Sequence, residues 1–235
     1  MEASALTALL RETAPAERLQ TLAQEFADLA RSSGVEVRPF DAKRPFERFR
    51  QLPLVRQEAI LAAFENYFGV VRSQLGLGHD LQDRRKRIFW GILGRLGLRP
   101  CSDLFDKLGE DDCVEVYGAD FIQIYRNMKF LELCSYNLDD IFACEWVELF
   151  YREPRITEAL AKEMTHVLSG GVRSTLQISD DAGQAEHVVS EVFLEERREF
   201  LVRHKYLSPL FDENGRPAAF VIILDAKVRS AMGAA

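Results

Sequence analysis

The residue types that could carry out chemistry occur in this sequence without the spacing that the chemistry needs. The cysteines form no CxxC pair and have no histidines at the spacing of a zinc site. Four cysteines in 235 residues also make no dense disulfide framework. We therefore expect reduced thiols, as in a cytoplasmic protein. The four are Cys101, Cys113, Cys134 and Cys144.

Nucleophile, nucleotide and acid–base motifs do not stand out either. The glycines Gly91, Gly94 and Gly97 recur within a helical stretch, whereas a phosphate-binding loop needs its glycines at a strand-to-helix turn. The acidic pair Asp139-Asp140 is typical of ordinary surface charge. No nucleophile is accompanied by a recognisable base. We therefore expect a binding protein and not an enzyme.

One basic amphipathic segment stands out from an acidic chain. Arg84, Arg85, Lys86 and Arg87 precede the apolar stretch 88–93. Such a segment can contact anionic lipid, nucleic acid or an acidic partner, but a short charge run on a helix is usually a solvated face. We favour the solvated face, then a protein partner, then a membrane or nucleic acid. The net charge of −7 argues against a general nucleic-acid binder.

The first hundred residues have a helical pattern. Apolar positions at steps of three and four predict a short helix near residues 6–10, a second from Pro15 to about 31, and two more at 53–75 and 79–98. Proline suits a first helical turn because its missing N–H is not needed there. No apolar run is long enough to span a bilayer or to form a signal peptide, so we expect a cytoplasmic protein.

The helix at 53–75 carries an apolar stripe at heptad-like steps, and such a stripe needs a partner surface. We favour a neighbouring helix of the same chain, because the stripe is shorter than a sustained coiled coil. The alternative is the seam of a homodimer, and the two can coexist. The stripe consists of Leu54 and of the five candidate seam residues Leu61, Phe64, Phe68, Val71 and Leu75.

After residue 112 the pattern changes from helical to alternating, then to helical turns, and then back to strands. This order predicts an α+β fold. We expect a helical region at 1–110, an α+β domain at 111–228 and a short tail at 229–235. The expected strands lie at 113–117, 121–125, 172–178, 188–194, 200–206 and 218–224, and the expected helices near 130–134, 137–142 and 154–168.

The last two strands carry a recognisable pattern. The dipeptide Ser208-Pro209 closes one strand, a turn runs from Asp212 to Gly215, and the apolar strand after it ends at Asp225. This arrangement is similar to the closing hairpin of the PAS family, in which a Ser-Pro, an Asp-x-x-Gly turn and an apolar strand ending in Asp follow one another. The hairpin carries most of the resemblance.

Two earlier motifs match the same family in the same order. Asn127 and Phe130 resemble the Asn and the aromatic residue that follow the family's second strand. The octapeptide at 135–142, Ser-Tyr-Asn-Leu-Asp-Asp-Ile-Phe, resembles its short Gly-Tyr-Ser-x-Glu-Glu-Leu helix. The resemblance extends over residues 112–227. Ser135 departs from the usual Gly, and Asp225 is followed by Ala-Lys instead of Ile-Thr.

Membership of the PAS family would imply a five-stranded antiparallel sheet whose last strand is central. Short helices would face this sheet across a pocket that binds a small molecule, haem or flavin, or the domain would only dimerise. The residues that the resemblance places at the pocket are Tyr125, Phe130, Cys134, Phe142, Trp146, Val202, Tyr206, Phe220 and Ile222.

The resemblance also allows the cofactors to be compared. A light-sensing flavin domain needs an Asn-Cys-Arg motif, which this sequence lacks, so we do not expect flavin. A haem domain offers a histidine beside the pocket, and His166 lies on the corresponding helix. Its rotation from the stripe of Ile156, Leu160, Met164 and Val167 puts it at the flank, which favours a solvent-facing or capping role. Cys134 is expected to pack as a small hydrophobe.

These observations predict a bacterial-type sensory or regulatory signalling protein. Its PAS-like domain would bind a small ligand or an unidentified protein partner, and its helices would form a homodimer. The alternative is an interaction or transcription-regulating module that binds no ligand, which would differ by having a filled pocket.

Overall fold

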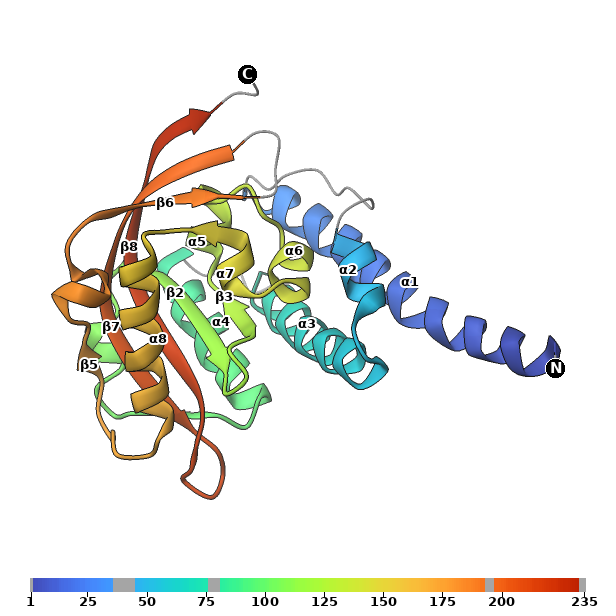
Figure 1. Ribbon diagram of the computed structural model, residues 1–235, viewed down its shortest axis with the longest axis horizontal. Helices are drawn as coiled ribbons and strands as arrows, with labels where there is room; N and C mark the ends of the chain where they lie inside the picture. The colour runs from blue at the N-terminus through green and yellow to red at the C-terminus, as the bar shows by residue number, and fades with distance from the viewer. Residues whose placement is uncertain (1, 36–44, 76–80, 193–196, 233–235) are drawn as a thin grey trace.

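The computed structural model describes residues 2–35, 45–75, 81–192 and 197–232, apart from some side chains within these ranges. Four helices precede the sheet, and four more, with two short helical turns, lie between or beside its strands (Figure 1). The first four are α1 (Glu2–Ser32), α2 (Pro45–Gln51), α3 (Leu54–Leu75) and α4 (Leu81–Arg95). The later ones are η1 (Phe105–Lys107), α5 (Met128–Leu133), α6 (Leu138–Ala143), α7 (Trp146–Leu149), α8 (Pro154–Leu168) and η2 (Asp180–Gln184).

The first helix differs from the prediction. The structure has one continuous helix through Pro15, where the sequence predicted a break and a new first turn. The helix ends where the backbone reverses at Gly34, whose φ is +80°. Val35 N–H donates to the Ala30 carbonyl at 3.0 Å, which closes a Schellman-type cap that a glycine can adopt without strain.

The helix α6 also corrects a prediction. Asp139 and Asp140 are buried, although the sequence indicated surface charge. The Asn137 backbone N–H donates to Asp140 Oδ2 at 2.9 Å, and the Asn137 side chain accepts from the N3 backbone, which forms a capping box. Asp140 of this pair is therefore used to start the helix.

All strand pairs of the sheet are antiparallel, and the last strand is central. The strands follow the order β3-β2-β8-β7-β6-β4, while β1 and β5 pair with β7. The resemblance implied this central position. The sheet has eight strands instead of five because it gains three strands of two residues each. Of these, β1 and β5 pair with β7, and β4 pairs with β6. The strands are β1 (Arg99–Pro100), β2 (Cys113–Gly118), β3 (Gln123–Arg126), β4 (Phe150–Tyr151), β5 (Leu176–Gln177), β6 (His187–Glu191), β7 (Arg197–Phe211) and β8 (Pro217–Met232).

The β7–β8 hairpin is longer than the sequence predicted. Strand β7 continues through Ser208-Pro209 to Phe211, and β8 runs into the predicted tail as far as Met232. Asp212 Oδ1 accepts from the backbone N–H groups of Asn214 at 2.9 Å and Arg216 at 2.8 Å, so the expected turn forms. This is the α+β, PAS-like fold that the sequence predicts.

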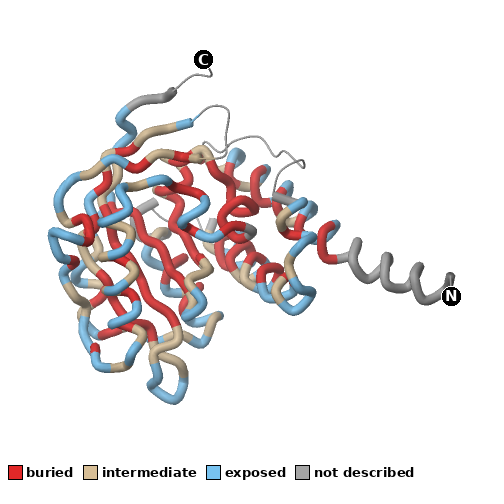
Figure 2. Tube along the Cα trace, in the orientation of Figure 1, coloured by how far each residue is buried: buried red, intermediate tan, exposed pale blue. Residues whose placement is uncertain are grey.

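Both faces of the sheet are covered. Strand β8 is buried on both faces from Ala219 to Leu224, as Figure 2 shows for the central traces. Helices α3 and α4 cover one face, which we call the outer face, where Tyr67 contacts Tyr125 and Phe89 stacks on Tyr125. The helices α5 to α8 cover the opposite, inner face. A sheet that is buried on both faces explains the nearly continuous apolar run in β8.

The apolar stripe of α3 packs within the chain except at its first residue, Leu54, which is 50% exposed. Leu61, Phe64, Phe68 and Val71 are all buried. Phe26 of α1 lies 6.0 Å from Phe64 and 6.4 Å from Phe68 between ring centroids. These four residues therefore do not form an exposed dimer seam, because α1 and the sheet domain already cover them. The side chain of Leu75 lies outside the described residues, and dimerisation itself stays a prediction.

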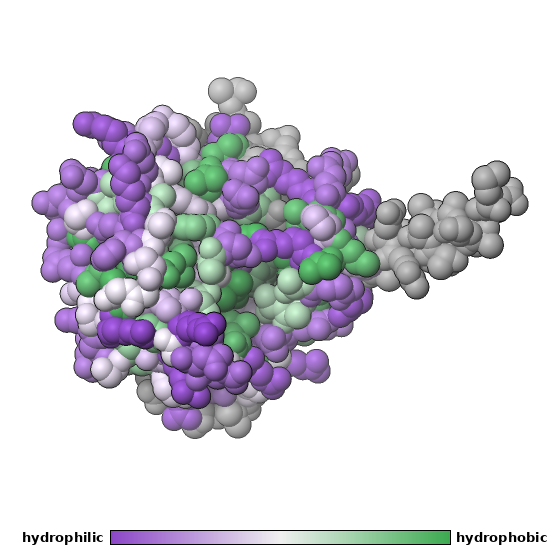
Figure 3. All heavy atoms as spheres, turned by 60° about the horizontal axis from the view of Figure 1, so that its bottom comes forward, coloured by the Kyte–Doolittle hydropathy of each residue, from purple (hydrophilic) through white to green (hydrophobic). Residues whose placement is uncertain are grey.

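The surface in Figure 3 is mostly hydrophilic, with separate hydrophobic patches between the charged groups. Among the described residues, no helix combines the length and the hydropathy needed to cross a membrane.

The buried junction between the helices and the sheet predicts cooperative unfolding. Phe64 contacts Phe142 of α6 at 5.5 Å and has no exposed surface, so Phe64→Ala should cost about 3–5 kcal/mol. Urea unfolding followed by circular dichroism and tryptophan fluorescence should give one shared, earlier transition. Val55→Ala, at a position on the same helix that is 84% exposed, is the control and should change little. A variant that unfolds the helices alone would contradict this coupling.

Candidate ligand site on the inner face of the sheet

Four polar side chains occupy inner positions of the first hairpin. The strand register places Glu115 opposite Arg126 and Tyr117 opposite Gln123. All four are buried, with Gln123 and Arg126 each 1% exposed. Inner positions of a covered sheet are normally apolar, so this group is a departure from ordinary core packing.

Arg126 and Glu115 form a buried ion pair. Arg126 Nη2 donates to Glu115 Oε1, and the Tyr117 hydroxyl donates to Glu115 Oε2 at 3.0 Å. The guanidinium carbon of Arg126 lies 3.7 Å from the centroid of the Phe130 ring. Burial, the largest single cause, lowers the pKa of Arg126, but Glu115, Cys134 and Tyr117 together raise it above its usual value, so the guanidinium stays charged. Each charge therefore depends on the other for compensation.

Two further polar groups on this side lack partners among the described residues. Neither amide atom of Gln123 makes a hydrogen bond, and the same is true of Nε and Nη1 of Arg152, although these atoms are shielded from solvent. Arg152 follows β4, and its guanidinium carbon lies 4.6 Å from the centroid of the Trp146 ring. Burial lowers its pKa, while Tyr117 and Glu115 raise it, which places Arg152 within electrostatic reach of the ion pair.

Two histidines lie beside this cluster. The ring centroids of His187 and His204 are 5.1 Å apart, and His204 Nδ1 lies 3.1 Å from the Ala182 carbonyl oxygen. A Cβ on Gly183, whose φ is +94°, would lie 2.6 Å from His187 Cε1 and 2.7 Å from His204 Nδ1. Both the backbone and the close approach therefore require glycine there. Burial is the main cause that lowers the pKa of His204 well below its usual value, and Arg152 and His187 add to it.

The inner face collects six of the nine predicted pocket residues, on the sheet and on the helices that face it. Phe130, Cys134, Trp146, Phe220 and Ile222 are buried there. Aromatic side chains already fill much of the space: Tyr117 stacks on Phe220 at 5.4 Å, and Phe130 contacts Phe150 at 6.0 Å. Val202 shares this face one register step beyond His204.

Three predicted pocket residues lie elsewhere. Tyr125 is on the outer face opposite Val116, where Phe89 stacks on it. Tyr206 is on the outer face as well, and Lys107 Nζ lies 5.5 Å from its ring centroid. Phe142 packs against Phe64, at the junction with α3.

Bulges explain why the two tyrosines were assigned to the wrong face. The pairing shifts between His204 and Tyr206, so Lys205 is an extra residue, and a second shift leaves Ile124 unpaired in β3. A bulge changes the face on which every later side chain of a strand lies. Regular alternation, by contrast, would place His204 and Tyr206 on one face.

The candidate haem ligand does not face this site. His166 is exposed on α8, and its backbone carbonyl accepts from the Ser169 hydroxyl at 2.6 Å. The described residues also contain no group of three or more His, Cys, Asp and Glu side chains placed to hold a metal ion. Cys134 and Cys144 are buried thiols whose pKa values burial raises, to about 11 for Cys144, so both are protonated at neutral pH.

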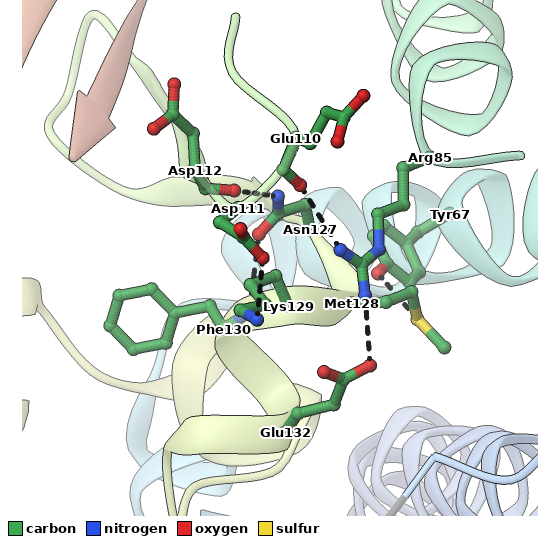
Figure 4. Close-up of polar contacts among 10 residues, drawn as sticks. All are labelled: Tyr67, Arg85, Glu110, Asp111, Asp112, Asn127, Met128, Lys129, Phe130 and Glu132. Atoms are coloured by element: carbon green, nitrogen blue, oxygen red, sulfur yellow. Dashed lines mark hydrogen bonds and ion pairs between the residues drawn. The ribbon is translucent and has the colours of Figure 1, made fainter. Parts of the chain in front are cut away.

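The basic segment is partly engaged within the chain. Arg85 donates to Glu132 Oε1 and to the Glu110 carbonyl, both at 3.3 Å (Figure 4). Figure 4 also shows the neighbouring cap of α5, in which Asn127 Nδ2 donates to the Asp112 carbonyl at 2.8 Å. Lys86 and Arg87 are exposed, and the side chain of Arg84 lies outside the described residues.

The sequence analysis missed the polar members of the site. Glu115, Gln123, Arg126, Arg152 and the histidine pair were not singled out. One signal was available: Glu115 interrupts a strand of valines, and an arginine stands at the matching position on the other side of a short turn. No sequence signal connects Arg152 or His187 to these two strands.

Comparisons with known proteins give a limited likeness. No family model matches the chain. No curated protein matches it either. A solved structure, that of a sensory box sensor histidine kinase from Vibrio cholerae, is similar at 15% identity and a TM-score of 0.34, and the alignment covers 54% of this chain and 88% of that chain. A TM-score this low carries no argument, so the PAS-like fold rests on the strand order and register of the chain itself.

The buried ion pair predicts an unequal response to single and paired substitutions. Glu115→Met and Arg126→Met should each destabilise the protein by about 3–5 kcal/mol, because each leaves the opposite charge buried without compensation. The double variant Glu115→Met/Arg126→Met should lose much less free energy of unfolding than the sum of the losses of the two single variants. Chemical denaturation of all four proteins measures the coupling. Additive losses would contradict a coupled pair.

The histidine pair predicts a pH dependence. The pKa of His204 is lower in the folded than in the unfolded protein, so the unfolded state binds more protons as the pH falls below about 6.5. Stability should be full above that pH and should decrease below it. His204→Asn, which keeps an N–H donor near Ala182, should reduce this decrease in thermal unfolding measured from pH 7.5 to pH 5. The control His166→Asn, at an exposed position, should leave the decrease in stability at low pH unchanged.

Proposed function

We propose that this chain is a sensory or regulatory signalling protein whose PAS-like domain binds a small anionic ligand at its inner face. One observation carries the proposal: Gln123 and Arg152 keep buried hydrogen-bonding atoms that no described residue satisfies. Unsatisfied groups of this kind cost about 1–3 kcal/mol each, and native proteins nearly always give them a partner. A bound ligand would supply those partners.

The charges of the site favour an anion. Glu115 is compensated by Arg126, so Arg152 contributes a positive charge with no carboxylate hydrogen-bonded to its shielded nitrogens. A carboxylate or a similar oxyanion accepts from guanidinium N–H groups in strong, charge-assisted bonds. The Gln123 amide can donate to the same ligand or accept from a hydroxyl or amino group on it.

The aromatic filling limits the size of the ligand. Tyr117, Phe130, Phe150 and Phe220 pack against one another or their neighbours on the inner face, which favours a compound of few heavy atoms. The same filling supports the second candidate function, an interaction module that binds no ligand. In that case ordered water would satisfy Gln123 and Arg152. Under both functions we expect the protein to act by binding and not by catalysis.

The test uses the whole chain. Native mass spectrometry should detect a retained small molecule, and titration with acetate, succinate, citrate and glutamate should raise the unfolding temperature for those that bind. Arg152→Gln should weaken that binding at least tenfold, because it removes the charge. The matched control Arg155→Gln lies at a largely exposed position nearby and should bind like the unchanged protein.

A negative result has a defined meaning. If no molecule is retained and none of the four anions changes the unfolding temperature, the small-anion proposal is wrong. The interaction module without a ligand is then the better description.

A further inference from the structure

A surface groove follows one side of α4. It consists of two adjoining cavities of about 650 and 470 Å³, and Trp90 and Phe105 line both of them. Cavities of this size are typical of sites that hold a small ligand or the anchoring side chains of a partner. The groove lies on the helical side of the molecule and shares no lining residue with the inner-face cluster, so it is independent of the proposed ligand site.

The centre of the groove is an exposed tryptophan. Trp90 is 59% exposed, and its ring meets that of Phe105 edge-on at 5.2 Å. Its neighbours Ile88, Phe89 and Ile92 turn toward the core and are buried. Helical geometry then directs Trp90 away from the core. Leu93, Leu98 and Pro100 extend the apolar lining beyond it, so the exposed ring is part of a continuous apolar surface and not an isolated residue.

Two glycines line the groove, Gly91 in the first cavity and Gly94 in the second. Gly91 is explained by packing against α3, because a Cβ there would lie 2.9 Å from Val70 Cγ1, whereas Gly94 is exposed. A Cβ on Gly94 would have no heavy atom within 4 Å, so the packing of the chain does not require glycine at that position. Glycine within a helix is unfavourable compared with alanine. An unfavourable residue that intramolecular packing does not need suggests a requirement from outside the chain.

The rim of the groove is basic. Lys86 and Arg87 line the first cavity, and Arg99 lines the second. No Asp or Glu is present among the described lining residues of either cavity, in a chain whose net charge is −7. An apolar centre with a basic rim is complementary to an acidic segment that carries an apolar side chain.

We propose that the groove beside Trp90 binds an acidic segment of a partner protein, with an apolar side chain of that segment packed against the paired rings of Trp90 and Phe105. A concave apolar surface between a helix and the turn around Phe105 suits an inserted side chain better than a flat lipid surface. The acidic balance of the whole chain also disfavours nucleic acid.

The experiment uses the full chain and a fluorescein-labelled 16-residue helical peptide with leucine and phenylalanine on one face and glutamate on the other. Fluorescence anisotropy should detect binding at 50 mM salt that weakens at least fivefold at 300 mM, because salt screens the basic rim. A peptide with lysine in place of every glutamate should bind at least tenfold more weakly. Comparable binding of the two peptides overturns the proposal.

Variants locate the binding. Trp90→Ala and Arg99→Glu should each weaken peptide binding at least fivefold. Gly94→Ala separates binding from folding, because it should leave the unfolding temperature unchanged or raised while it narrows the groove and weakens binding. The control Val55→Ala, at the opposite end of α3, should bind like the unchanged protein. If Trp90→Ala and Gly94→Ala bind the peptide normally, the peptide does not use this groove and the proposal is wrong.

Binding of a second copy of this chain, or of lipid or nucleic acid, in the groove would also overturn the proposal. Sedimentation velocity should give a sedimentation coefficient that Trp90→Ala does not change. Loss of a self-associated species in that variant would instead make a second copy of this chain the occupant. Pelleting with phosphatidylserine vesicles, or a gel shift with duplex DNA, in the absence of peptide binding would assign the basic rim to lipid or nucleic acid.

Discussion

The buried charge of Arg126 constrains both sides of the sheet. Its guanidinium needs Glu115 on the inner face, and a charge enclosed between aromatic rings has no solvent to replace that partner. The backbone of the same residue is used on the other side, because its carbonyl accepts from the Tyr67 hydroxyl of α3 at 2.8 Å. One residue of an edge strand therefore fixes the inner cluster and the docking of the N-terminal helices together.

This arrangement gives the two proposed sites a continuous physical connection. Tyr125, next to Arg126, stacks on Phe89 of α4, and Phe89 contacts Phe105, which lines the groove. Contact alone does not make a signalling path, since coupling needs an element with two arrangements that both sites influence. The short edge strand β3 is suited to such a role. It is paired on one side only and contains a bulge, so fewer hydrogen bonds hold it than hold β8.

The sequence predicted the features that depend on local patterns. The closing hairpin, the helix at α8 and the change from helical to alternating periodicity follow from residues close together in the chain. The bulges at Ile124 and Lys205 were not predictable in this way, because no local residue type demands them, and they moved Tyr125 and Tyr206 to the outer face. The inner cluster was missed for a related reason. Arg152 meets Glu115 only through the pairing of distant strands.

Stability is a weak explanation for the buried ion pair. Well-packed apolar residues of similar volume often replace such a pair with no loss, because two buried charges lose their hydration. What the pair does provide is a polar but electrically compensated wall beside Arg152. With Glu115 occupied by Arg126 and Tyr117, no carboxylate of the first hairpin remains for Arg152, which keeps its shielded N–H groups without an acceptor among the described residues. An apolar core would leave Arg152 equally positive but would remove the polar wall beside it. If the proposed ligand site exists, we therefore expect the pair to affect its ligand selectivity more than the folding of the sheet.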